Sequence, residues 1–242
     1  ASIPEDWMQG RTTYGGLTAA LSLEAALELA EDMPVRSAQI AFVGPVGGDV
    51  VISPTLLRRG KNTAFISVDV VGEQGVAARS IFTFGAKRES ALDFRKLEAP
   101  SVAEPHEIES FFEGGRRPKF SEHFNVRLAA GGRPVSGAPD ADITLWMRHK
   151  DDAALYNATS LLAIGDAPPP AALTMFTAPA PISSMTWMAE FLTDHIDTDN
   201  GWFLARHTAQ TAKDGYSSQS MRMWNTRGEP VMVGRQTLAV FA

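Results

Sequence analysis

The sequence contains no cysteine, which excludes disulfide bonds, thiolate catalysis and cysteine-ligated metal sites. It also lacks a basic excess: 22 lysines and arginines stand against 28 aspartates and glutamates, and this argues against a nucleic-acid-binding protein. No apolar run approaches the roughly 18 residues that a membrane span needs. The first residues lack the basic start and apolar stretch of a signal peptide. We therefore expect a soluble, cytoplasmic protein.

Several common catalytic and cofactor motifs are missing as well. There is no phosphate-binding glycine loop followed by Lys-Ser/Thr, no dinucleotide-binding fingerprint and no Gly-x-Ser-x-Gly elbow. Histidines and carboxylates do not cluster at metal-ligand spacing. The sequence therefore predicts neither a cofactor nor a metal.

The first half of the chain combines one apolar helix with a run of strands. Apolar residues recur at helical spacing from Leu17 to Met33, and Pro34 ends the run. Almost every side chain in this segment is aliphatic or alanine, which is typical of a helix that other structure surrounds. Strand-like runs separated by glycine-containing turns then follow at 38–43, 49–58, 63–71 and 76–85. A curved antiparallel sheet with one apolar face can wrap such a helix.

The second half repeats this plan after an irregular segment at 91–117, which is rich in charge, proline and glycine. Residues 151–164 have helical spacing. Strand-like runs lie before this helix at 122–130 and 140–149, and after it at 181–192, 202–211, 216–225 and 230–241. We therefore predict an α+β fold with two repeats, 1–90 and 118–242, joined by a linker at 91–117. Each repeat would have a long central helix wrapped by an antiparallel sheet.

Three short segments strengthen this interpretation: Gly10–Gly16 at the first helix, Pro181–Trp187 at a late strand, and Gly228–Gln236 near the end. With their order and spacing, the chain resembles the double hot-dog acyl-CoA thioesterases, the family of bacterial acyl-CoA thioesterase II and its peroxisomal relatives. The resemblance implies a double hot-dog fold that hydrolyses acyl-CoA to a free fatty acid and CoA. It is also consistent with a homodimer of double hot-dog chains.

The resemblance further implies a water molecule held by an aspartate, a serine or threonine, and a glutamine, all from the second repeat. The glutamine falls on Gln236, eight residues after the hairpin glycine Gly228, and the hydroxyl falls on Thr208. The aspartate should precede the strand tryptophan Trp187 by four residues, where this chain has Ser183. The expected catalytic set is thus Ser183, Thr208 and Gln236, and it departs from the family pattern at the acid.

The missing acid matters because water that attacks a thioester needs a proton acceptor of usable basicity. A neutral serine orients water but does not serve as a base without help, and no histidine lies in a motif beside it. Asp166 and Asp152, which bracket the second helix, are the replacement carboxylates that the sequence offers. The alternative is a non-hydrolytic acyl-CoA or fatty-acid binding protein with a degenerate site.

Other candidate residues have two interpretations each. Gly15 and Gly16 either form a tight turn into the helix or present backbone N–H groups to an oxyanion of the substrate. Gln236 is a polar residue in an alternating apolar run, so it must find a partner. Arg58, Arg59 and Lys61 either bind CoA phosphates or form a solvated hairpin.

Overall fold

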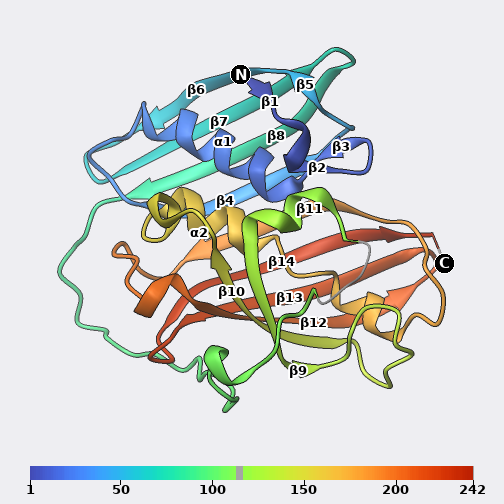
Figure 1. Ribbon diagram of the computed structural model, residues 1–242. Coiled ribbons are helices and arrows are strands. Elements are labelled where there is room, and N and C mark those ends of the chain that lie inside the picture. The colour runs from blue at the N-terminus through green and yellow to red at the C-terminus, as the bar shows by residue number, and fades with distance from the viewer. Residues whose placement is uncertain (113–116, 242) are drawn as a thin grey trace.

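The computed structural model describes residues 1–112 and 117–241, and within these ranges ten strands form one antiparallel sheet (Figure 1). In sheet order these strands are β6 (Val51–Arg59), β7 (Thr63–Gly72), β8 (Gly75–Gly85), β4 (Val35–Phe42), β11 (Ile182–Phe191), β14 (Pro230–Val240), β13 (Tyr216–Asn225), β12 (Phe203–Lys213), β10 (Asp142–His149) and β9 (Phe124–Gly131). Two short ladders lie apart from this sheet: β1 (Ser2–Ile3) with β5 (Gly48–Asp49), and β2 (Met8–Gln9) with β3 (Thr12–Thr13).

Two α-helices in the described ranges, α1 (Gly15–Leu27) and α2 (Ala158–Gly165), lie side by side on one face of the sheet (Figure 1). The first helix ends before Met33, where the sequence predicted its end. The N–H groups of Leu29 and Ala30 bond to carbonyls three residues back, which tightens the chain into turns. Neither helix is long and apolar enough to cross a membrane.

The second helix is much shorter than the 14 residues predicted over 151–164. The side chain of Asn157 accepts a hydrogen bond from the Ser160 N–H and so starts α2 there. The preceding residues Asp152–Ala154 form a separate 3₁₀ turn, which the Asp151 side chain caps. The prediction of a long helix in both halves therefore holds better for the first half than for the second.

In both halves the helix is followed by four strands of the ten-stranded sheet, in agreement with the sequence-based prediction. In the first half the strands are ordered β4-β8-β7-β6 outward from the centre, and in the second half β11-β14-β13-β12. The first strand after each helix therefore lies at the centre, where β4 and β11 pair antiparallel from Ala41↔Thr186 to Ser37↔Glu190. Strands β10 and β9 extend the second half beyond this shared plan.

Alternation along the strands assigns side chains to opposite faces of the sheet. One row of paired residues faces the helices and is buried: Ile40, Trp187, Gln236 and Gln219. The adjacent row faces the other way: Gln39, Met188, Arg235, Ser220 and Thr208. Gln236 and Thr208 therefore lie on opposite faces, which decides their roles below.

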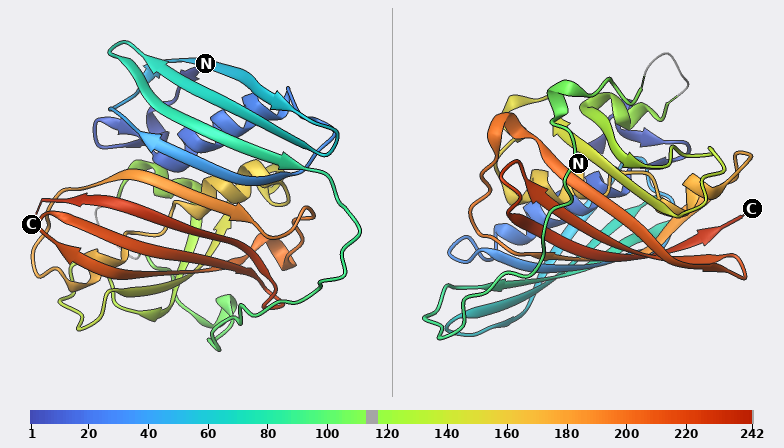
Figure 2. Two further views of the ribbon diagram at one scale, coloured as in Figure 1. Left: turned by 180° about the vertical axis from the view of Figure 1, so that it is seen from behind. Right: turned by 90° about the horizontal axis from the view of Figure 1, so that it is seen from below.

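Residues 86–104 form neither helix nor strand and run along the outside of the second half (Figure 2). The Leu97 carbonyl accepts a hydrogen bond from the Trp224 indole, and the Ala103 carbonyl accepts one from the Trp146 indole. This segment thus covers the tryptophans that project away from the helices. Residues 113–116 of the predicted linker lie outside the described residues, and the domain limits 1–90 and 118–242 stay a prediction.

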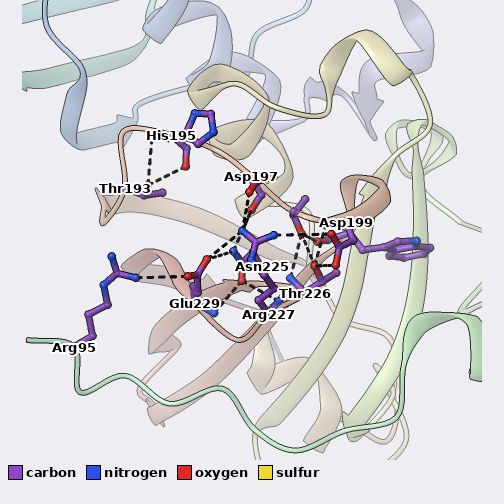
Figure 3. A network of polar contacts seen from close by, with 11 residues as sticks. Arg95, Thr193, His195, Asp197, Asp199, Asn225, Thr226, Arg227 and Glu229 are labelled. Atoms are coloured by element: carbon purple, nitrogen blue, oxygen red, sulfur yellow. Dashed lines mark hydrogen bonds and ion pairs between the residues drawn. The ribbon is translucent and has the colours of Figure 1, made fainter.

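The turn between β13 and β14 is held by the buried Asn225, at the centre of a polar network (Figure 3). Its Nδ2 donates to the Asp197 carbonyl at 3.1 Å and to Glu229 Oε2 at 2.7 Å. Its Oδ1 accepts from the backbone N–H groups of Arg227 and Glu229 at 3.0 and 2.9 Å. One amide therefore satisfies four groups and joins the turn to the loop after β11.

Replacing Asn225 by alanine is expected to lower the free energy of unfolding by about 1–3 kcal/mol, because buried partners lose their hydrogen bonds. Urea denaturation measures the change. Arg227→Gln, which removes exposed ion pairs of the same network and one long hydrogen bond to the Asp197 carbonyl, should have a smaller effect. Equal losses in the two variants would contradict the central role of the Asn225 amide.

Candidate active site

A pocket of about 900 Å³ opens where the two helices meet the sheet, and both halves of the chain line it. The first half contributes Gly15, Thr18 and Phe42, and the second half contributes Asp166 and Gln236. Much of the remaining lining is apolar: Pro45, Ala77, Ala78, Phe111, Phe112, Pro118, Phe120, Ala167, Pro168, Pro169, Pro170, Leu173 and Ile182. The pocket therefore combines a few convergent polar groups with an apolar wall, as small-molecule sites do.

Asp166 is the aspartate whose side chain lines this pocket. It directly follows α2, and Gln236 Nε2 of β14 donates a hydrogen bond to its Oδ1 at 2.5 Å. Burial raises the pKa of Asp166 to about 7, although hydrogen bonds from the Gln236 side chain and the Gly16 backbone oppose that rise. Near neutral pH a substantial fraction of Asp166 is therefore ionised, and this is the form that can act as a general base.

Gly15 and Gly16 bring the start of α1 against the end of α2. A Cβ on Gly15 would lie 2.7 Å from Asp166 Oδ2, and one on Gly16 would collide with the Ala163 carbonyl and the Tyr14 hydroxyl. The Tyr14 hydroxyl itself donates to the Ala163 carbonyl at 2.5 Å, which ties the two helices together. Only glycine permits this close approach at either position.

The oxyanion role of the two glycines stays a prediction. The Gly16 backbone lies against the Asp166 carboxylate and favours its ionised form, which opposes the rise of the Asp166 pKa. Gly15 lines the pocket, so its N–H is the nearer candidate for an oxyanion of the substrate.

The Thr208 side chain does not lie beside Gln236, where the sequence-based prediction placed it. Its Oγ1 donates to Asp142 Oδ2 at 2.8 Å, and it lines a separate shallow pocket beside Arg206. The strand assignment was right, but the side chain projects from the face of the sheet that is turned away from the helices. A shift of one residue along a strand reverses the face.

Ser183 lies at the start of β11 and lines the mouth of the large pocket together with Ser184. Its side chain is exposed, and no hydrogen bond joins it to Asp166 or Gln236 among the described residues. The position therefore faces the site without taking part in the Asp166–Gln236 pair.

The two replacement carboxylates end up in different environments. Asp166 faces the pocket, whereas the side chain of Asp152 is 81% exposed and forms an ion pair with Arg148 at 2.7 Å. Asp166 is therefore the one that meets the geometric requirement for a base at this site.

The basic hairpin is remote from this pocket. Arg59 bonds to the Leu29 carbonyl and pairs with Asp32, both beyond the C-terminal end of α1. The pocket lies at the other end of this 13-residue helix, about 20 Å away. Arg58, Arg59 and Lys61 are absent from its lining, and the arginines that do line it are Arg11 and Arg133.

Sequence reasoning missed several residues that shape the site. Tyr14 stacks on Phe120, which lines the pocket, with ring centroids 4.1 Å apart, and Gln219 supports Gln236 from β13. Phe120 lies in a 3₁₀ turn before the first strand of the second half, and Tyr14 lies in the turn before α1, where no periodicity distinguishes either residue. No group of three or more histidine, aspartate or glutamate side chains in residues 1–112 and 117–241 is arranged to hold a metal ion.

Comparison with protein families gives matches to both halves of the chain. The family model for the acyl-CoA thioesterase N-terminal domain matches residues 3–85. The model for the acyl-CoA thioesterase C-terminal domain matches residues 98–240. No curated protein matches the sequence.

Solved structures show the same architecture. A conserved protein of unknown function with a hot-dog fold from Alicyclobacillus acidocaldarius has 22% identity and a TM-score of 0.90, covering 100% of this chain and 92% of that chain. A proposed thioesterase from Novosphingobium aromaticivorans has 21% identity and a TM-score of 0.84, with 100% and 94% covered. The acyl-CoA thioesterase II from Mycobacterium marinum has 16% identity and a TM-score of 0.76, with 100% and 92% covered. These likenesses establish the hot-dog fold.

Proposed function

Because the chain belongs to the acyl-CoA thioesterase family, we propose that it hydrolyses acyl-CoA to a free carboxylic acid and CoA, with Asp166 as the base. The observation that carries this proposal is the Asp166–Gln236 hydrogen bond inside a pocket at the N-terminus of α1. Asp166 thus supplies the carboxylate whose expected position holds Ser183.

In the proposed reaction, ionised Asp166 accepts a proton from water as the water oxygen bonds to the thioester carbonyl carbon. The carbonyl oxygen gains negative charge, which the N–H of Gly15 at the positive end of α1 would stabilise. The carbon–sulfur bond then breaks, the acid leaves, and the CoA sulfur takes the proton that Asp166 holds. Gln236 keeps the carboxylate in place through its hydrogen bond to Oδ1.

The acyl group and the CoA phosphates of the substrate would contact different parts of the pocket. The apolar lining that includes Phe42, Phe111 and Phe120 suits an acyl group, whereas Arg11 and Arg133 suit the phosphates of CoA. Arg133 also donates to the Phe111 carbonyl at 2.9 Å and lies over the Phe111 ring, so it braces that wall.

At a finer level, we propose that residues 1–90 and 118–242 are two hot-dog repeats that form one double hot-dog unit. Two such chains would associate as a homodimer. CoA thioesters are made and used inside cells, which supports a cytoplasmic location.

Replacement of Gln236 by alanine is expected to reduce kcat/KM by about 10- to 100-fold at pH 7, because the Asp166 carboxylate loses a charge-assisted hydrogen bond. Release of free CoA from a panel of acyl-CoA chain lengths measures it. Arg235→Ala is the matched control, since its exposed side chain projects from the opposite face of the same strand and bonds to Ser218.

Two results would count against this function. Absence of CoA release by the wild-type protein across the whole panel would rule out the hydrolase. If calorimetry then detected acyl-CoA binding, the chain would instead be a non-hydrolytic binding protein.

A further inference from the structure

Gln219, a residue outside the expected catalytic set, lies directly behind Gln236. It projects from β13 toward the helices, and its side chain is fully buried. Its Nε2 donates to Gln236 Oε1 at 2.7 Å, and its Oε1 accepts from the Ala171 N–H at 2.8 Å. A buried amide with both ends bonded in this way has a defined orientation.

The direction of each hydrogen bond follows from the one before it. Ala171 begins a 3₁₀ helix, so its N–H has no partner within that helix and is able only to donate. Gln219 must therefore turn its oxygen to Ala171 and its nitrogen to Gln236. Gln236 must then turn its oxygen to Gln219, which leaves its own nitrogen to donate to Asp166.

We propose that Gln219 is a positioning residue that fixes the Gln236 amide so that an N–H, and not a carbonyl oxygen, faces Asp166. This role rests on the function proposed above for the Asp166 site. Gln219 is absent from the residues that line the pocket, so it acts through Gln236 rather than on the substrate. A reversed Gln236 amide would present an acceptor to the carboxylate and disfavour its ionised form.

The buried imidazole of His207 is a third neighbour of the Gln219 side-chain amide, beside Gln236 and Ala171. Its Nδ1 lies 3.4 Å from Gln219 Nε2, and its other nitrogen faces the backbone of Gly165, the residue before Asp166. Burial lowers the pKa of His207 to about 3, so the ring is neutral at pH 7. In the tautomer that carries its proton on Nε2, Nδ1 accepts from Gln219 and both amide hydrogens of Gln219 are engaged.

The other polar and titratable groups around Asp166 are few. Tyr14 precedes α1, the Gly16 backbone lies against the carboxylate, and Gln236 faces Asp166 from β14. Arg11 and Arg133 line the same pocket. Of these groups only Gln236 contacts Gln219, so the direct route from Gln219 to Asp166 runs through the Gln236 amide, and His207 beside Gly165 is the second neighbour of both.

Two substitutions separate this role from simple packing. Gln219→Met removes both the donor and the acceptor, whereas Gln219→Glu keeps an acceptor for the Ala171 N–H and removes the donor to Gln236. Gln210→Met serves as the control, because this exposed glutamine lies on the neighbouring strand and bonds only to Thr208 and Ser220.

Both Gln219 variants are expected to lower kcat at pH 7 about tenfold with little change in KM, because the ionised base is less populated. The pH–rate profile should move to higher pH, so that activity approaches the wild-type level near pH 9. A loss that is equal at every pH would show a merely structural role and overturn the proposal, and so would a wild-type profile.

Carbon-13 NMR titration of the Asp166 carboxyl tests the same role without turnover. The pKa of Asp166 should be higher in both Gln219 variants than in the wild type. In the wild-type protein, the side-chain amide signals of Gln219 and Gln236 should shift with the same midpoint as Asp166, and this holds whether or not the variants fold. If the Gln219 amide signal did not shift as Asp166 titrates, the proposal would be overturned. If no protein releases CoA, the hydrolase function fails, while the titration still decides the role of Gln219.

Discussion

Replacement of Asp166 by asparagine is expected to lower kcat/KM for acyl-CoA by about 10²- to 10⁴-fold, the range for loss of general-base assistance. Asparagine preserves the shape and still accepts the hydrogen bond from Gln236 Nε2, so the loss would report on proton transfer rather than on packing. In the wild type, kcat/KM should rise with pH through about 7, where Asp166 ionises. Release of CoA over pH 5–9 measures both effects.

Asp152→Asn is the matched control, since this exposed aspartate lies on the other side of α2 and pairs only with Arg148. It should keep the wild-type rate and the wild-type pH profile. Activity of Asp166→Asn within a few-fold of the wild type would exclude Asp166 as the base.

The same aspartate should make folding stability depend on pH. Its pKa rises from 3.8 in a free side chain to about 7 in the folded protein, so folding favours the protonated form. The stabilising contribution is fully present below about pH 4 and is lost as pH rises through about 7. The shift corresponds to at most about 4 kcal/mol.

Asp166→Asn should therefore be more stable than the wild type at pH 8, with a difference that shrinks as the pH falls toward 4. Urea denaturation at four or five pH values measures the free energy of unfolding of both proteins. Gln236 supports this assignment, because its donated hydrogen bond favours the ionised form and so limits the cost. A difference that stays constant across the pH range would show that Asp166 titrates normally in the folded state.

The sequence predicted those parts of the molecule that local patterns determine. Alternating strands such as Thr63–Gly72 and Gly75–Gly85 have one buried and one more exposed face, and short turns join them. The isolated polar residue Gln236 in an apolar strand indicated a buried partner, and that partner is Asp166, one of the two carboxylates suggested as replacements.

The rest depends on contacts between distant segments. Thr208 was assigned to the correct strand but to the wrong face, because a threonine gives no indication of which face is buried. Gln219 lies in the polar segment 216–220, where no apolar alternation reveals an inward residue, and its partner Ala171 is 48 residues away. The position of the basic hairpin at Arg59 also depends on such contacts, since only the fold places it at the far end of α1.

The central pairing of β4 with β11 has a consequence for how such a site can change over time. Gly16 belongs to the first half of the chain, and Asp166 and Gln236 belong to the second, so the β4–β11 pairing and the Tyr14–Ala163 contact between the helices together hold these groups in place. The first helix ends at the exposed Glu28, whereas the second ends at Asp166. A symmetric pair of identical subunits would have to carry every substitution at two sites at once. Covalent joining removes that constraint, because the place in the first half that corresponds to Asp166 can change without altering Asp166 itself.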